Sequence, residues 1–234
     1  TRDLTERRRA EQERLRLGQE ARRRISVLSE LSEALAGALT IEDVARAVVD
    51  EDVAYRNADT CTFYSLDSTR EVLHLVAQRG LSPEIVERVQ RIAAGDGNPF
   101  HAIGAAGGPA VWIESEAEYA AYFPSLATAD LEGTRVRACC CVPLMAEGDA
   151  IGMLGAGFHE PRTFSDEERE FVTLLARHCA QALARARRLA AERASATLAE
   201  RLRSSLATTL RSIGDAVITA DPRDTKTVRA FERL

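Results

Sequence analysis

Long apolar runs, paired cysteine motifs and basic patches among aromatics are all missing from this 234-residue chain. No apolar stretch approaches the roughly 20 residues that a membrane-spanning helix needs, and no positively charged start followed by an apolar stretch marks a signal peptide. We therefore expect a cytoplasmic fragment without a membrane segment. The formal net charge is -5 and aromatic residues make up 5% of the chain, so we expect no nucleic-acid partner.

The five cysteines lack the spacing of a disulfide framework or a metal site. Cys139, Cys140 and Cys141 are adjacent, and neighbours on one strand point to opposite faces. No CxxC or His-x-x-x-His pair is present, so we expect no metal. All five thiols, Cys61 and Cys179 included, are predicted to be reduced and to pack as small hydrophobes. A redox role would require one of the three adjacent thiols to face a pocket or to have a lowered pKa.

A helix with coiled-coil spacing is predicted for residues 1–39. Arg, Glu, Gln and Leu dominate its first 24 residues, which contain one glycine and no proline. A seam of three- and four-residue steps, with Ser32 as its polar member, suits packing against a partner helix: Ile25, Leu28, Leu35 and Leu39. Thr40 and Asp43 have the form of a capping box that starts a second helix, with Leu39 and Val44 as its hydrophobic staple.

Strand and turn signals fill the middle of the chain. Residues 60–66 and 71–77 are β-favouring runs joined by turn residues, which predicts a hairpin. Residues 136–144 and 151–158 predict a second hairpin across the turn at 146–149.

Helix starts and a short strand, at residues 110–113, separate the two hairpins. Ser82 and Asn98 each precede a proline, so each is expected to cap a helix, the first of which runs to about Ala93. Strands joined in places by tight hairpins and interrupted by helices indicate an α/β (α+β) fold, with an antiparallel central sheet flanked by helices.

The clearest capping box, Ser165 with Glu168, opens a long C-terminal helix, and Ser115 with Glu118 fits the same pattern earlier in the chain. No proline or glycine follows Ser165 before Gly214. A helix this long and this charged cannot be buried in one small domain, so we expect it to leave the domain and pair with a partner. Its predicted contact and signalling face comprises Phe171, Leu174, Leu175, His178, Ala182 and Leu189.

The N-terminal seam and this C-terminal face together predict a parallel homodimer, because an exposed apolar strip of that length would be an aggregation liability in a monomer. Farther along, Leu198 and Leu202 fit a different heptad phase from the other apolar residues, which indicates a stutter. Those other residues are Leu189, Ala196, Leu206, Leu210 and Ile213.

Five short motifs resemble the GAF domain family in order and spacing. They are Leu31-Ser32-Glu33-Ala34-Leu35, Thr40-Ile41-Glu42-Asp43-Val44, Ala58-Asp59, Val142-Pro143-Leu144 with Ile151-Gly152-Met153-Leu154, and Arg162-Thr163-Phe164-Ser165 with Glu167-Glu168. The resemblance covers about residues 28–189. It implies an antiparallel sheet with one face packed on the terminal helices and a pocket on the other face. It also implies regulation more often than catalysis, as in sensory proteins of the sensor histidine kinase type.

A second, shorter resemblance begins near Leu206. Residues 210–221 are similar to the opening helix and first strand of a PAS domain, but the expected small-residue continuation is replaced from Pro222 onward. The expected organisation therefore has four parts: a linker or coiled-coil helix (1–39), a GAF-like sensory domain (40–164), a signalling helix (165–205) and a truncated PAS-like start or disordered tail (206–234).

The pocket implied by the GAF resemblance has seven candidate lining residues: Phe63, Phe100, His101, Trp112, Tyr119, Cys139 and Cys141. His101 lies in the segment that commonly frames the pocket of GAF domains, and its neutral imidazole would suit a haem or a hydrogen bond. The aromatic residues either pack a helix on the sheet or wall an apolar cavity. The segment has no cysteine for a covalent bilin, and the residue set of cyclic-nucleotide-binding members is not found, so the cofactor stays unknown.

The function expected from these features is that of a non-catalytic sensory module. It would bind a small molecule, dimerise and pass a signal along its helices to an output domain such as the histidine kinase of a two-component system. Two other classes stay open: a structural dimerisation spacer without ligand, and a thiol-based enzyme similar to the GAF proteins that reduce free methionine sulfoxide.

Overall fold

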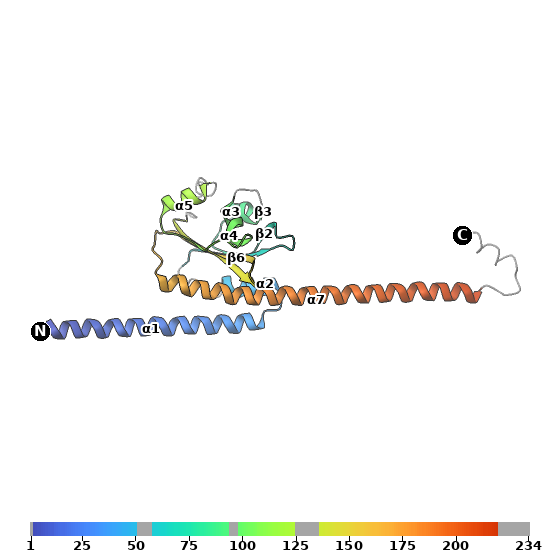
Figure 1. Cartoon of the computed structure of the whole chain (residues 1–234), viewed down its shortest axis with the longest axis horizontal. Coiled ribbons are helices and arrows are strands. Elements are labelled where there is room, and N and C mark those ends of the chain that lie inside the picture. Colours follow the sequence, from blue (N-terminus) through green and yellow to red (C-terminus); the bar gives the residue numbers. More distant parts are fainter. Residues whose placement is uncertain (1, 51–57, 94–97, 125–135, 220–234) are drawn as a thin grey trace. The chain divides into compact units, whose positions relative to one another are not determined.

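The computed structural model describes residues 2–50, 58–93, 98–124 and 136–219 (Figure 1). The chain divides into two units, residues 1–187 and 188–234. The first unit contains a mixed α/β domain, and the second contains the continuation of the long C-terminal helix.

The first unit is built on one six-stranded sheet in which every neighbouring pair is antiparallel, as predicted. The strand order is β3-β2-β1-β6-β5-β4. Both predicted hairpins are confirmed, and Glu147 and Gly148 turn the β5–β6 hairpin with φ values of 54° and 91°, in the left-handed region that a two-residue turn requires. The strands are β1 (Thr60–Leu66), β2 (Val72–Arg79), β3 (Arg91–Ala93), β4 (Val111–Ile113), β5 (Ala138–Ala146) and β6 (Asp149–Phe158).

The helices begin where their capping residues predict. Thr40 and Asp43 form the complete capping box, in which the Thr40 hydroxyl accepts from Asp43 N and the Asp43 carboxylate accepts from Thr40 N. The Ser82 and Asn98 side chains accept from the first turns of their helices. The helices are α1 (Arg2–Gly37), α2 (Ile41–Asp50), α3 (Pro83–Val89), α4 (Pro99–Gly104), α5 (Glu116–Tyr122) and α7 (Asp166–Thr219).

One element was predicted wrongly. The helix expected to reach Ala93 ends at Val89, and residues 91–93 form the edge strand β3. Ile92, opposite Leu73 on β2, is 1% exposed. This strand is therefore stabilised by its partner and by burial, which a local helix pattern does not reveal.

The sheet separates two apolar layers. Helices α1, α2 and the first part of α7 pack on one face, here called the helical face, against side chains such as Phe63, Val142 and Leu154. The opposite face, here called the pocket face, packs against α4 and α5 through Tyr64, Met153 and their neighbours. Figure 1 shows α3, α4 and α5 on the opposite side of the sheet from α7.

The expected partner-helix seam requires correction, because three of its ten residues are buried inside the domain itself and two more are partly buried there. Leu35, Leu175 and Ala182 are 4%, 0% and 2% exposed and belong to the core between α1, α2, α7 and the sheet. Leu28 and Phe171 are partly buried against that core. Among the residues whose burial is described, Val27, Leu31 and Leu35 of α1 and Ala38 directly after it are buried. The predicted helical spacing is confirmed, but many of the apolar residues of the seam pack against their own chain.

Several apolar side chains of the two terminal helices remain exposed in the single chain. Ile25 on α1 is 67% exposed, Leu39 in the connection between α1 and α2 is 50% exposed, and Leu174 on α7 is 38% exposed. His178 and Leu189 are partly exposed.

In the second unit, residues 188–219 are helical, so the strand expected in the PAS-like segment does not form as far as Thr219. Residues 220–234, where that segment would continue, lie outside the described residues. Four leucines in four-residue steps are 57–67% exposed: Leu198, Leu202, Leu206 and Leu210. None of the described helices combines the length and apolarity required to cross a membrane.

Candidate functional site

A small cavity of about 60 Å³ lies on the pocket face of the sheet. Strands β1, β5 and β6 form its floor, and helices α3, α4 and α5 contribute its walls. Its lining residues are Thr60, Thr62, Tyr64, Leu81, Ile85, Val89, Phe100, Tyr119, Val136, Cys139, Cys141, Gly155, Ala156 and Gly157.

The floor of the cavity consists of two rows of residues that cross three paired strands. The strand register aligns Cys139–Gly157–Thr60 in one row and Cys141–Gly155–Thr62 in the next. The two glycines leave the space that the threonines occupy: a Cβ added at Gly155 would lie 2.6 Å from Thr62 Oγ1, and one at Gly157 would lie 2.5 Å from Thr60 Oγ1. The glycines therefore keep the floor open between the thiols and the hydroxyls.

Aromatic residues and neutral hydroxyls form the wall. The Tyr64 hydroxyl donates to the Val89 carbonyl oxygen at 3.2 Å, and burial raises the pKa of Tyr64. Burial also raises the pKa of Tyr119, so both phenols stay protonated. Phe100 packs against Phe123 with ring centroids 4.5 Å apart. Among the lining residues that the structure describes, none carries a charge at neutral pH, so the cavity suits an uncharged group.

All five cysteines are buried, as predicted, and all five are free thiols. Cys139 and Cys141 face the cavity, whereas Cys140 packs on the other side of the sheet near Phe158 and Phe164. A hydrogen bond with Cys139, together with burial, raises the pKa of Cys141. Burial raises the pKa of Cys179 to about 12. Cys141 and Cys179 are therefore thiols rather than thiolates at neutral pH.

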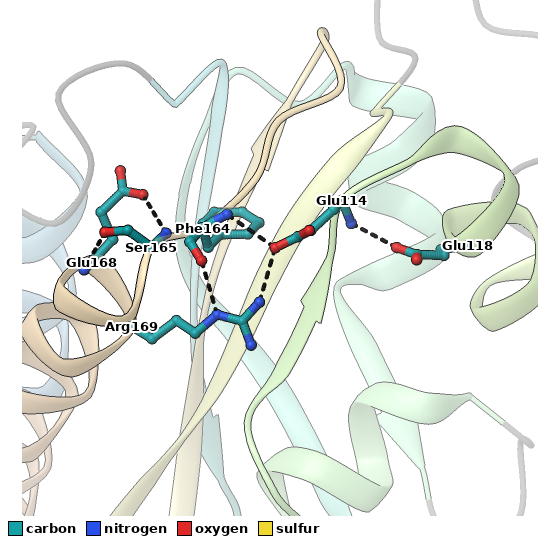
Figure 2. Close-up of polar contacts among 6 residues, drawn as sticks. All are labelled: Glu114, Glu118, Phe164, Ser165, Glu168 and Arg169. Atoms are coloured by element: carbon teal, nitrogen blue, oxygen red, sulfur yellow. Dashed lines mark hydrogen bonds and ion pairs between the residues drawn. The ribbon is translucent and has the colours of Figure 1, made fainter.

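A polar junction joins the start of α5 to the start of α7 (Figure 2). One carboxylate oxygen of Glu114 accepts from the Phe164 amide at 3.0 Å and from the Arg169 guanidinium at 2.8 Å. Arg169 also donates from Nε to the Phe164 carbonyl oxygen at 3.1 Å. The hydrogen bond from Phe164, followed by the charge and hydrogen bond of Arg169, lowers the pKa of Glu114.

Capping interactions extend this junction into both helices. Glu118 on α5 accepts from the Glu114 amide at 2.8 Å, while Ser115 accepts from the Glu118 amide, so the predicted box is present but shifted by one residue. At the other side, Ser165 and Glu168 form the complete predicted box at the start of α7. Figure 2 shows Glu114 lying between the two capped helix starts.

Arg187 makes a second polar link between α7 and the sheet. Its guanidinium donates to the Ser65 hydroxyl at 2.8 Å, to the Ile151 carbonyl oxygen at 2.9 Å and to the Leu66 carbonyl oxygen. Burial lowers the pKa of Arg187 from its ordinary value of 12.5, which leaves the group fully charged at neutral pH. The last residue of the first unit thus binds strands β1 and β6 directly.

Comparison with known proteins places this architecture in a family. The model of the GAF domain matches residues 38–184. The chain belongs to the GAF domain family. A search of curated protein sequences found no match.

Solved GAF structures share the fold at low sequence identity. The GAF domain of a phosphoenolpyruvate-protein phosphotransferase from Coxiella burnetii is 23% identical, with a TM-score of 0.59 over 73% of this chain and 98% of that one. The corresponding domain from Acinetobacter is 20% identical, with a TM-score of 0.56 over 70% and 93%. Free methionine-R-sulfoxide reductase from Neisseria meningitidis, in complex with its substrate, is 20% identical, with a TM-score of 0.53 over 70% and 90%.

In this GAF domain, four of the seven predicted pocket residues line the cavity: Phe100, Tyr119, Cys139 and Cys141. The other three do not. Phe63 and Trp112 point to the helical face, because side chains alternate along β1 and β4. The His101 Nε2 atom lies 3.2 Å from the Glu71 carbonyl oxygen, and His101 is not among the lining residues.

Sequence reasoning missed the threonines and glycines of the floor, and it missed Glu114. The Gly155-x-Gly157 spacing on a strand was an available signal, since residues two apart share a face and glycine in a strand marks a close approach. Glu114 carried no such signal, because its partners Phe164 and Arg169 lie 50 and 55 residues away in the chain.

Proposed function

We propose that this GAF domain is a non-catalytic sensory module. A small uncharged molecule, or the uncharged part of a larger one, binds at the cavity on the pocket face. The resulting shift reaches an output domain, such as a histidine kinase, through α7. The cavity volume of about 60 Å³ is far below the roughly 300–1,000 Å³ of a typical drug-sized site, so a larger ligand requires the walls to move.

The observation that carries this proposal is the position of α5. This helix contributes Tyr119 to the cavity wall, and its first turn is hydrogen-bonded to Glu114, which holds the start of α7. A ligand that displaces Tyr119 therefore moves a helix that is tied to the start of α7 within a few residues. Because packed elements switch between discrete arrangements, a small displacement at the wall can change the setting of α7.

We further propose that two copies pair in parallel through their terminal helices. The apolar side chains left exposed on or beside these helices support a second copy as the partner: Ile25, Leu39 just after α1, and Leu174, with Leu198, Leu202, Leu206 and Leu210 farther along α7. The last four recur every four residues, a longer step than the 3.5-residue heptad average, so this stretch departs from regular heptad packing.

Light scattering tests the pairing. We expect the mass of a dimer at tens of micromolar protein, and a monomeric mass at that concentration would contradict the proposal. Native mass spectrometry of the purified chain tests the ligand, since a retained small molecule adds its mass to each subunit.

Helix insertions test the route of the signal in the protein that carries this domain together with its output domain. Seven residues inserted between Ala191 and Thr197 add two turns of a heptad seam and should preserve regulation, whereas four residues should lock the output on or off. Equal regulation after both insertions would show that the phase of α7 does not carry the signal.

The enzyme alternative is separable by one assay. The thiolate is the reactive form of cysteine, and the raised pKa of Cys141 favours its thiol form. We therefore expect no turnover when the chain is incubated with free methionine sulfoxide and a dithiol reductant. Turnover that disappears on substitution of Cys139 or Cys141 would instead establish a reductase.

A further inference from the structure

Thr60 carries a buried hydroxyl that has no partner among the described residues. Thr60 and Ser65 are the two buried Ser or Thr residues that the structure describes, at 4% and 7% exposed. The Ser65 hydroxyl accepts from Arg187 at 2.8 Å, whereas the Thr60 hydroxyl makes no hydrogen bond within residues 2–50, 58–93, 98–124 and 136–219. A buried hydroxyl without a partner costs folding free energy, so its presence at this position points to a partner from outside the chain.

The Thr60 hydroxyl faces the cavity. A Cβ added at Gly157, on the cavity floor, would lie 2.5 Å from Thr60 Oγ1, which places this oxygen on the pocket face. The hydroxyls of Thr62 and Tyr119 line the same cavity and also bond to no residue of the described chain. After burial, the nearby thiols of β5 contribute to the raised pKa of Tyr119, so its hydroxyl lies close to that strand. Three O–H donors therefore border one cavity without a described partner.

We propose that the ligand of the pocket face presents a neutral carbonyl oxygen, as in a ketone or an amide, to the hydroxyls of Thr60, Thr62 and Tyr119. A carbonyl oxygen has two lone pairs that accept hydrogen bonds, so it supplies the partner that these donors lack. This inference rests on the proposed function in one respect, namely that the cavity is a binding site. It adds the chemical class of the ligand.

The lining disfavours charged ligands and purely apolar ones. An ionised group would lose its hydration without gaining an opposite charge, because none of the described lining residues is charged at neutral pH. A hydrocarbon would leave the buried Thr60 hydroxyl unpaired. The cavity volume of about 60 Å³ is below the roughly 150 Å³ of an apolar cavity that admits benzene. The space therefore suits a carbonyl group and the few atoms attached to it.

Three solutes of similar size test this chemistry on the full chain: acetone, its apolar analogue isobutene and the acetate ion, compared at equal concentration. The methyl NMR signals of Ile85 and Val89, which line the cavity, report binding there. The signals of Leu175, in the core of the helical face, are the control. We expect acetone to shift both cavity signals in a saturable manner, while isobutene and acetate leave them unchanged.

Variants that remove one hydroxyl and keep the shape of the side chain identify the donors. Thr60→Val and Tyr119→Phe should each weaken acetone binding about 2–10-fold, which is the effect of losing one neutral hydrogen bond. The matched control is Tyr122→Phe, which removes a hydroxyl from the same helix at a residue that is 38% exposed and outside the lining. This control should leave the affinity for acetone unchanged.

A second measurement needs no ligand. Because the Thr60 hydroxyl is unpaired in the free chain, Thr60→Val should leave the melting temperature unchanged or raise it. Ser65→Ala should lower the melting temperature, because Arg187 loses an acceptor. Substitutions that stabilise a protein at a ligand site commonly cost function, and Thr60→Val is expected to behave in this way.

Several outcomes would overturn the carbonyl ligand. These are no shift with acetone, equal shifts with isobutene, or a Thr60→Val variant that loses as much melting temperature as Ser65→Ala. A molecule without a carbonyl group that is retained on the purified chain would overturn the ligand class and leave the sensory function standing. Carbonyl binding that leaves the output of the intact protein unchanged would overturn the sensory function and support this site.

Discussion

The two faces of the sheet differ in what their side chains do, although the same strands supply both. On the helical face, the side chains of Phe63, Cys140 and Val142 are packed without space against α1, α2, α7 or the aromatic residues near them. On the pocket face, glycines leave a gap in the floor, and hydroxyl and thiol groups border it. At these residues one face therefore supplies apolar packing, whereas the other borders the cavity with hydroxyl and thiol groups.

The largest loss of stability is expected from a substitution in the core of the helical face. Leu175 is 0% exposed between α1, α2 and the sheet, so Leu175→Ala should lower the free energy of unfolding by about 2–5 kcal/mol. Leu174, the neighbouring residue, is 38% exposed, and Leu174→Ala should cost less than about 1 kcal/mol. Urea denaturation of both variants measures this, and equal losses would show that α7 is not packed as described.

Adding a side chain where Gly155 and Thr62 approach closely should have the next largest effect. Gly155→Ala places a Cβ 2.6 Å from Thr62 Oγ1, and such overpacking costs about 1–3 kcal/mol. Thermal unfolding should show the double variant Gly155→Ala/Thr62→Ala recovering part of that loss, because the second change removes the clashing oxygen. Gly37 has no atom near its added Cβ, so Gly37→Ala is the control and should not lower the melting temperature.

The adjacent cysteines allow the two faces to be compared at one strand. Cys140→Ala leaves an unfilled space in a packed layer and should cost about 1–2 kcal/mol. Cys141→Ala should cost less, because its sulfur already borders a cavity. Chemical denaturation gives both losses of unfolding free energy. A larger loss for Cys141→Ala would show that Cys141 lies in the packed layer and Cys140 beside the cavity. All five thiols are buried, so a thiol reagent should label the native chain slowly.

The smallest effect is expected at the junction that links the pocket wall to α7. The pKa of Glu114 is lowered in the folded chain, so its ionised form stabilises the fold at pH values above the ordinary carboxyl pKa. This contribution is lost as the pH falls through the lowered pKa of the folded state. Glu114→Gln should therefore reduce stability slightly at neutral pH and flatten the acid limb of the stability profile. Thermal unfolding of the wild-type chain and the variant from pH 7 to pH 3 checks this. Parallel profiles of stability against pH would show that the ionised Glu114 does not stabilise the junction.

Local chemistry predicted much of the fold. The boxes at Thr40 and Ser165 and the caps at Ser82 and Asn98 involve residues within four positions of each other, so the sequence contains all the information they need. Both hairpins follow from alternation and turn residues. Strand β3 was missed because three residues beside a helix acquire strand geometry only when β2 pairs with them.

Site residues were predictable where the alternation of side chains along a strand could be counted from a residue already placed in the pocket. Once Cys139 and Cys141 are placed in the pocket, the pairing of β4 with β5 assigns Trp112, opposite Cys140, to the helical face. A single sequence does not state that pairing, and it also does not state whether an apolar seam packs on its own domain or on another chain. Leu35 and Leu175 show this second limit, since their helical spacing is equally compatible with either partner.

The position of Arg187 has a consequence for how such domains are recombined. Ala186 is the last buried side chain among the residues whose burial is described, and Arg187 bonds to two strands of the sheet directly after it. All three bonds come from the Nη2 atom of Arg187, so one nitrogen holds α7 to both strand β1 and strand β6. A gene fusion made after residue 187 would therefore exchange the downstream protein while the domain keeps its buried core side chains and the bonds of Arg187, provided that the new segment continues as a helix.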